Sequence, residues 1–209
     1  FTAALLWPVD QDPRSRPATV AIAALMLVGC SIGTWPRAQV WQNSETLFAA
    51  AVEAEPMSAT AHMNLGQALS KRGAVAEAAR HYQIAATLKP GSATAHFNLG
   101  NSLRETGQLE DAVAEYETAL RANPDYAAAA NNLGDDYARQ QRFDEAIQWF
   151  QRAVGMQPEL AAGHINLARA LLIVGRHEEA VSAAQRAVDL KPSNDGYRRT
   201  LAEAREKTQ

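Results

Sequence analysis

The chain has 209 residues, of which 47% are hydrophobic and only 7% aromatic, so any core is built mainly from alanine and leucine. Its 20 basic and 23 acidic residues give a net charge of −3, which argues against partners such as nucleic acid or an anionic surface. The single cysteine, Cys30, excludes an internal disulfide framework and a cysteine-based zinc site.

The N-terminal part of the chain differs in composition from the rest. After an irregular flank at residues 1–16, residues 17–36 contain no charged side chain. As a helix this segment would be about 30 Å long, which is the thickness of the hydrocarbon core of a membrane. The length predicts a transmembrane helix and membrane association, and the arginines before the segment predict that the following residues lie on the extracytoplasmic side.

Two other interpretations of residues 17–36 stay open. The segment can instead be a buried helix that pairs with residues 39–58, in which case the chain is a soluble cytoplasmic protein. A cleaved signal peptide is the third interpretation, although no small-residue cleavage pattern follows the apolar run.

The remainder of the chain repeats every 34 residues. The repeated positions include a leucine at position 7, a small residue at position 8, alanines at positions 20 and 27, and an aromatic residue at position 24, which is alanine in the last unit. The full units are 59–92, 93–126, 127–160 and 161–194, and the prolines in register are Pro56, Pro90, Pro124, Pro158 and Pro192. A fixed period of this length predicts a stack of identical structural units.

Each unit is expected to contain two helices. Apolar residues at helical spacing fill both halves, and a glycine suited to a left-handed turn separates them at Gly73, Gly107 and Gly175, where the third unit has Gln141. A helix pair this short cannot bury its apolar face alone, so the units must stack into a solenoid. Residues 39–58 are then the second half of an earlier unit, and residues 195–209 form a capping helix.

These columns resemble the tetratricopeptide repeat family, most clearly at residues 61–66 and 107–112. The resemblance implies an all-α, right-handed superhelical solenoid that binds a protein or peptide ligand in its concave groove and is not itself an enzyme. Residues 41–48, placed after an apolar segment, resemble the last membrane span of O-mannosyltransferases that carry such repeats. That second resemblance implies, as an alternative function, an accessory domain that presents acceptor proteins to a membrane-bound glycosyltransferase.

Asparagine occupies position 6 of all four units, on the helix that lines the groove in this family. Asparagine is a mediocre helix former, so four of them at one position ask for an explanation. An amide both donates and accepts hydrogen bonds, and a regular row of amides suits the backbone of an extended peptide. The column resembles the asparagine ladder of O-linked N-acetylglucosamine transferase; the alternative is that these amides bond only within the scaffold. The column consists of Asn64, Asn98, Asn132 and Asn166.

Variable residues beside this column are expected to contact ligand side chains. They occupy position 9 of each unit, with one further residue at position 5 of the third unit. The predicted contacts are Gln67, Asn101, Asp135, Arg169 and Asn131.

Other polar residues do not predict a catalytic or metal site. Three histidines share position 4, but equivalent residues on stacked helices lie about 10 Å apart, whereas zinc ligands lie about 2 Å from the ion. We therefore predict packing roles for them, and no metal or cofactor. The adjacent carboxylates Asp135 and Asp136 point in different directions on a helix, so we expect solvated surface groups or charges near a turn and not an acid/base pair. The position-4 histidines are His62, His96 and His164.

Overall fold

A computed structural model describes residues 44–208, which form ten α-helices and no β-strand. The all-helical repeat architecture predicted from the 34-residue period is confirmed. Within each unit, a helix of 13 residues is followed by one of 14. The helices are α2 Ser44–Ala54, α3 Ala59–Lys71, α4 Val75–Leu88, α5 Ala93–Glu105, α6 Leu109–Ala122, α7 Ala127–Arg139, α8 Phe143–Met156, α9 Ala161–Ile173, α10 His177–Leu190 and α11 Asp195–Glu206.

The predicted membrane span at 17–36, and the flank at 1–16, lie outside the described residues. None of the helices within 44–208 combines the length and the hydropathy that crossing a membrane requires. The interpretation of the N-terminal segment therefore stays a prediction.

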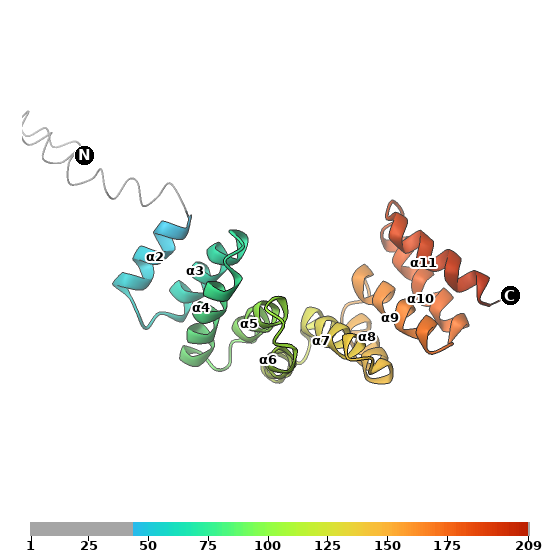
Figure 1. The fold of residues 1–209 in the computed structure, drawn as a ribbon, viewed down its shortest axis with the longest axis horizontal. Helices are drawn as coiled ribbons and strands as arrows, with labels where there is room; N and C mark the ends of the chain where they lie inside the picture. The colour runs from blue at the N-terminus through green and yellow to red at the C-terminus, as the bar shows by residue number, and fades with distance from the viewer. Residues whose placement is uncertain (1–43, 209) are drawn as a thin grey trace, which may run out of the picture.

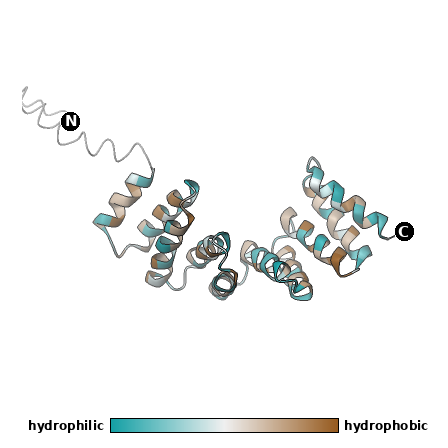
Figure 2. Cartoon of the chain, viewed as in Figure 1, coloured by the Kyte–Doolittle hydropathy of each residue, from teal (hydrophilic) through white to brown (hydrophobic). Residues whose placement is uncertain are grey.

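The helix pairs follow one another along an arc, with α2 near one end and α11 near the other (Figure 1). The helices α5 and α9 lie on the inner side of this arc, and their partners α6 and α10 lie on the outer side. Hydrogen bonds between side chains of α5 and α7, and of α7 and α9, join the first helices of neighbouring units. Hydrophobic and hydrophilic residues are interleaved along each helix, as expected where one face is buried (Figure 2).

The turn inside each unit uses a left-handed backbone conformation. Gly73, Gly107 and Gly175 have φ angles of 86°, 84° and 80°. Gln141 takes the same place in the third unit with a φ of 62°, so this turn keeps its geometry without glycine. A side chain in this conformation is strained, so the third turn forms at some cost in stability.

Each of the first three units packs an aromatic ring against a glycine. A Cβ atom placed on Gly100 would lie 2.7 Å from the Tyr116 ring, which is closer than two carbon atoms can approach. The fourth unit has alanine at both places. Ala168 replaces the glycine and Ala184 replaces the aromatic residue, so one side chain is larger and the facing one is smaller. The pairs are Gly66–Tyr82, Gly100–Tyr116, Gly134–Phe150 and Ala168–Ala184.

Polar side chains at position 4 stabilise the turns between units, except in the third unit, where position 4 is Ala130. A ring nitrogen or guanidinium nitrogen at this position hydrogen-bonds the carbonyl oxygen of the proline six residues earlier, an acceptor that no helix satisfies. This contact gives a specific form to the packing role predicted for the histidines. The bonds are His62 Nε2 to Pro56 O at 3.0 Å, His96 Nε2 to Pro90 O at 3.0 Å, His164 Nε2 to Pro158 O at 2.9 Å and Arg198 Nη1 to Pro192 O at 2.9 Å.

Candidate functional site

The asparagine column lies on the first helix of each unit and is partly exposed at all four positions. Its N-terminal half consists of Asn64 on α3 and Asn98 on α5. Neither side-chain amide makes a hydrogen bond to another residue of the 44–208 range. These two amides keep their donors and acceptors available.

The C-terminal half of the column bonds to the scaffold. Asn132 Nδ2 donates to Asn101 Oδ1 at 2.8 Å, and Asn166 Nδ2 donates to Asn131 Oδ1 at 3.2 Å. The Tyr116 hydroxyl also donates to Asn101 Oδ1, at 2.7 Å, and burial raises the pKa of this hydroxyl to about 12. Here the amides link successive first helices, which is the alternative weighed for the whole column.

The predicted groove residues at position 9 have unlike surroundings. Gln67 is exposed on α3. Asp135 on α7 accepts from two arginines, Arg104 Nη1 at 3.2 Å and Arg139 Nε at 3.0 Å. Arg169 on α9 is exposed and forms no ion pair with another residue of the described range. Whether any of the predicted site residues contacts a ligand stays a prediction.

Two pockets open beside the asparagine column. A pocket of about 360 Å³ lies between α2 and α3, where Leu47, Phe48 and Thr60 surround the approach to Asn64. A smaller pocket of about 150 Å³ lies between α7 and α9 and is bordered by Asp135, Asn166, Arg169 and Ile173. The first is largely apolar and the second carries charge, so the two pockets offer different chemistry.

The expectation that Asp136 is a solvated surface carboxylate is wrong. Its side chain is 0% exposed, and neither carboxylate oxygen has a hydrogen-bond partner among the described residues. Burial raises the pKa of Asp136 to about 6, and the positive charge of Arg104 opposes this shift only in part. The same position holds Ala68, Ser102 and Ala170 in the other units, so a carboxylate is specific to the third unit.

The first unit contains a histidine pair that the sequence analysis did not find, because the two histidines occupy different positions of the repeat. His62 Nδ1 lies 2.9 Å from His81 Nδ1, and the two rings stack with centroids 5.2 Å apart. Because the Pro56 carbonyl only accepts, His62 Nε2 carries a proton, so in the neutral ring Nδ1 accepts from His81. Burial, and then the charge of His62, lower the pKa of His81.

The second unit places a carboxylate where the first has His81. His96 Nδ1 lies 2.6 Å from Glu115 Oε2, and its Nε2 faces a carbonyl, so a protonated ring satisfies both acceptors. Among the described residues no group of three histidine, cysteine or acidic side chains is placed to hold a metal ion.

Sequence reasoning missed the arginines that surround Asp135. Arg104 precedes Asp135 by 31 residues and Arg139 follows it by four. The four-residue spacing is visible in any helix, and the 31-residue spacing follows from the period once the first helices are known to lie side by side. Both signals were therefore present in the sequence.

The tetratricopeptide repeat family matches residues 37–93, 97–161 and 150–195. The chain belongs to the tetratricopeptide repeat family. These repeats support a protein-interaction scaffold as the general role of the described range. No match is found among curated proteins.

Solved structures of MamA have the same fold as these repeats. One MamA crystal structure superposes with a TM-score of 0.65 at 21% identity, and covers 69% of this chain and 85% of its own. The MamA RS-1 ArsTM double mutant gives 0.66 at 21%, with 83% and 97% covered. MamA 41-end from Desulfovibrio magneticus RS-1 gives 0.62 at 22%, with 72% and 90% covered. At this identity the likeness describes the solenoid and not the ligand.

Proposed function

We propose that the inner side of the repeat arc binds an extended segment of a protein, and that Asn64 and Asn98 hold the backbone of that segment. One observation supports this proposal. Two consecutive units carry a partly exposed asparagine at position 6, and neither side-chain amide has a hydrogen-bond partner in the described range. Because both amides are partly exposed and bond to no neighbouring side chain, their donors and acceptors are open to an external partner.

Amides at one position of stacked units suit an extended chain. Packed helices lie about 8–10 Å apart, and a strand advances about 3.3 Å per residue. Neighbouring asparagines can therefore contact every third residue of a ligand. An amide that donates to a carbonyl and accepts from an N–H holds the backbone whatever the side chains are.

The apolar pocket between α2 and α3 adds a place for a side chain. It lies directly beside Asn64, and Leu47 and Phe48 contribute apolar lining. A ligand whose backbone is held at Asn64 can place one apolar side chain there. Burying a leucine-sized side chain stabilises a complex by about 2 kcal/mol, so this contact supplies affinity while the amides supply alignment.

A random peptide library displayed against the full chain tests the proposal. Selected peptides are expected to bind the Asn64→Ala/Asn98→Ala variant about ten-fold or more weakly, since two hydrogen bonds of about 1 kcal/mol each are lost. Gln148→Ala, which removes an exposed amide from α8, is the matched control and should bind normally. Equal affinities for wild type and the double variant, with both fully helical, would remove these asparagines from the site.

The uncharged segment 17–36 supports a further proposal about location. With this segment in a membrane, the repeats are tethered to it on the extracytoplasmic side, as in an acceptor-presenting domain of a membrane glycosyltransferase. Extraction of the full chain from isolated membranes with alkaline carbonate tests the tether. Release of the chain into the soluble fraction would contradict it.

A further inference from the structure

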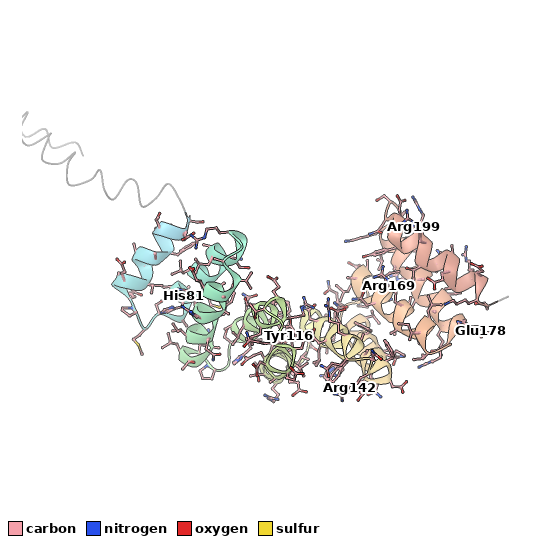
Figure 3. The ribbon with its side chains drawn as sticks, in the orientation of Figure 1. His81, Tyr116, Arg142, Arg169, Glu178 and Arg199 are labelled. Carbon is pink, nitrogen blue, oxygen red and sulfur yellow. The ribbon has the colours of Figure 1, made fainter. Side chains whose placement is uncertain are left out.

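Arg169 is unlike the other arginines on the inner side of the arc. Figure 3 labels it on α9, where it is an exposed residue. Arg104 and Arg139 both bond Asp135, whereas Arg169 has neither a hydrogen bond nor an ion pair within residues 44–208. A guanidinium with five donors is thus left to solvent on the first helix of the fourth unit.

The repeat itself explains why this cation is unpaired. Asp135 receives its partners from residues 31 before and four after it. The residues at the same spacings around Arg169 are Ala138 and Ile173, which carry no charge. The two positions that supply ion-pair partners to Asp135 therefore supply no carboxylate to the Arg169 guanidinium.

The nearby carboxylates have other partners. Asp135 borders the same pocket as Arg169 but is shared by two arginines. Glu203 borders the pocket on the other side, and its carboxylate pairs with Lys207 Nζ at 3.1 Å. Positive charge on this stretch of the inner surface is left without an equal negative charge.

Space for a ligand lies on both sides of Arg169. The pocket between α7 and α9 has a volume of about 150 Å³, and the pocket between α9 and α11 has about 340 Å³. Ile173 borders both pockets and is 61% exposed, so an apolar surface lies one helical turn from the guanidinium. Because the surface continues in both directions, a bound segment passes over Arg169 instead of ending there.

We propose that Arg169 binds the side-chain carboxylate of an aspartate or glutamate in the bound segment, and that a neighbouring apolar side chain of the ligand packs on Ile173. This inference rests on the proposed function, since it names the chemistry of the segment that the groove takes. The planar guanidinium matches a carboxylate with two parallel hydrogen bonds, which lysine cannot form. The ligand class is an extended acidic-apolar peptide.

Peptides selected from the random library on the full chain provide the probe. The selected sequences are expected to be enriched in aspartate or glutamate beside an apolar residue. Arg169→Gln should weaken a selected acidic peptide about five-fold, as for an ion pair near a surface, and Arg169→Lys should restore only part of the loss. Arg186→Gln, an exposed arginine on the second helix of the same unit, is the matched control and should bind as wild type.

A second pair of peptides locates the carboxylate. Replacing the ligand's acidic residue with its amide should weaken wild type but leave the affinity of Arg169→Gln unchanged, because the contact is already lost. Amidation of the peptide C-terminus should have no effect. A five-fold loss on amidation, or equal losses for Arg169→Gln with both peptides, would overturn the side-chain assignment.

Failure of the Arg169 contact and failure of the groove as a binding site give different results. If selected peptides depend on Asn64 and Asn98 but show neither acidic enrichment nor sensitivity to Arg169→Gln, the Arg169 assignment is wrong and the groove remains the site. If no peptide of the library binds above background, both the groove and the Arg169 assignments fall.

Discussion

The two halves of the asparagine column show how one repeated residue comes to serve two purposes. In the third and fourth units, Asn132 and Asn166 bond to amides on the preceding first helix. In the first and second units, Asn64 and Asn98 lack such partners in the described range. The difference lies in the neighbours, because Asn101 and Asn131 supply acceptors only to the later units. A repeated position predicts a shared place in the fold, while adjacent positions decide its chemistry.

The largest expected effect comes from a residue found in only one unit. Replacing the buried carboxylate by Asp136→Ser, the residue of the second unit, should stabilise the protein by about 2 kcal/mol at pH 7.5, because an unpartnered buried charge is removed. The matched control Asp111→Ser removes an exposed carboxylate and should not stabilise. Urea unfolding measures both changes.

The same variant has a defined pH dependence. The folded-state pKa of Asp136, about 6, lies above its ordinary value of 3.8, so the folded protein binds the proton more tightly than the unfolded chain. Wild-type stability from this group is greatest below pH 3.8 and is lost as the pH rises through 6. The advantage of Asp136→Ser should therefore grow between about pH 4 and 6 and stay level above 7. An advantage independent of pH would contradict the assignment.

The next effect separates the two halves of the column directly. Asn132→Ala and Asn98→Ala gain the same helix propensity, so the difference between them reports the hydrogen bonds of the Asn132 side chain, chiefly the one to Asn101 at 2.8 Å and also the long one from Asn131 at 3.5 Å. Asn132→Ala should be less stable than Asn98→Ala by about 1 kcal/mol in urea unfolding. Equal free energies of unfolding would mean that the two halves do not differ.

The smallest effect compares the first two units. His81 has a lowered pKa, so its contribution to stability is fully present above its ordinary value of 6.5 and is lost as the pH falls from there through the lower pKa of the folded state. His81→Glu copies the His96–Glu115 arrangement and should raise stability by about 0.5 kcal/mol at pH 5.5. Melting temperatures at pH 5.5 and 7.5 check this, and a gain confined to pH 7.5 would count against it.

Most of the fold followed from the period of the sequence. The prolines, small residues and turn glycines fix where each helix begins and ends, and they predict the left-handed turns observed at Gly73, Gly107 and Gly175. Gln141 shows the limit of such reasoning, since tertiary packing imposes the same conformation on a residue that does not favour it. The sequence shows that Ala168 and Ala184 differ from the glycine and the aromatic residue of the other units. Only the structure shows that the two alanines are buried in the same cluster.

The place of the asparagine column on the first helices was predictable, and its bonding was not. The column at position 6 was found because the same residue recurs four times. Its division into bonded and unbonded halves depends on side-chain contacts between units, which a single repeat position does not reveal. The burial of Asp136 was missed for a similar reason, because two adjacent carboxylates on a helix can face the core and the solvent respectively.

The most direct measurement is a titration of the isotope-labelled protein with a selected peptide, observed at the side-chain amide resonances of the asparagine column. Alanine variants at each position assign the four signals. The resonances of Asn64 and Asn98 should shift most as the peptide binds, while that of Asn132, which is bonded to Asn101, should move little. Shifts confined to Asn132 and Asn166, or binding with no shift at any of the four, would contradict the division of the column.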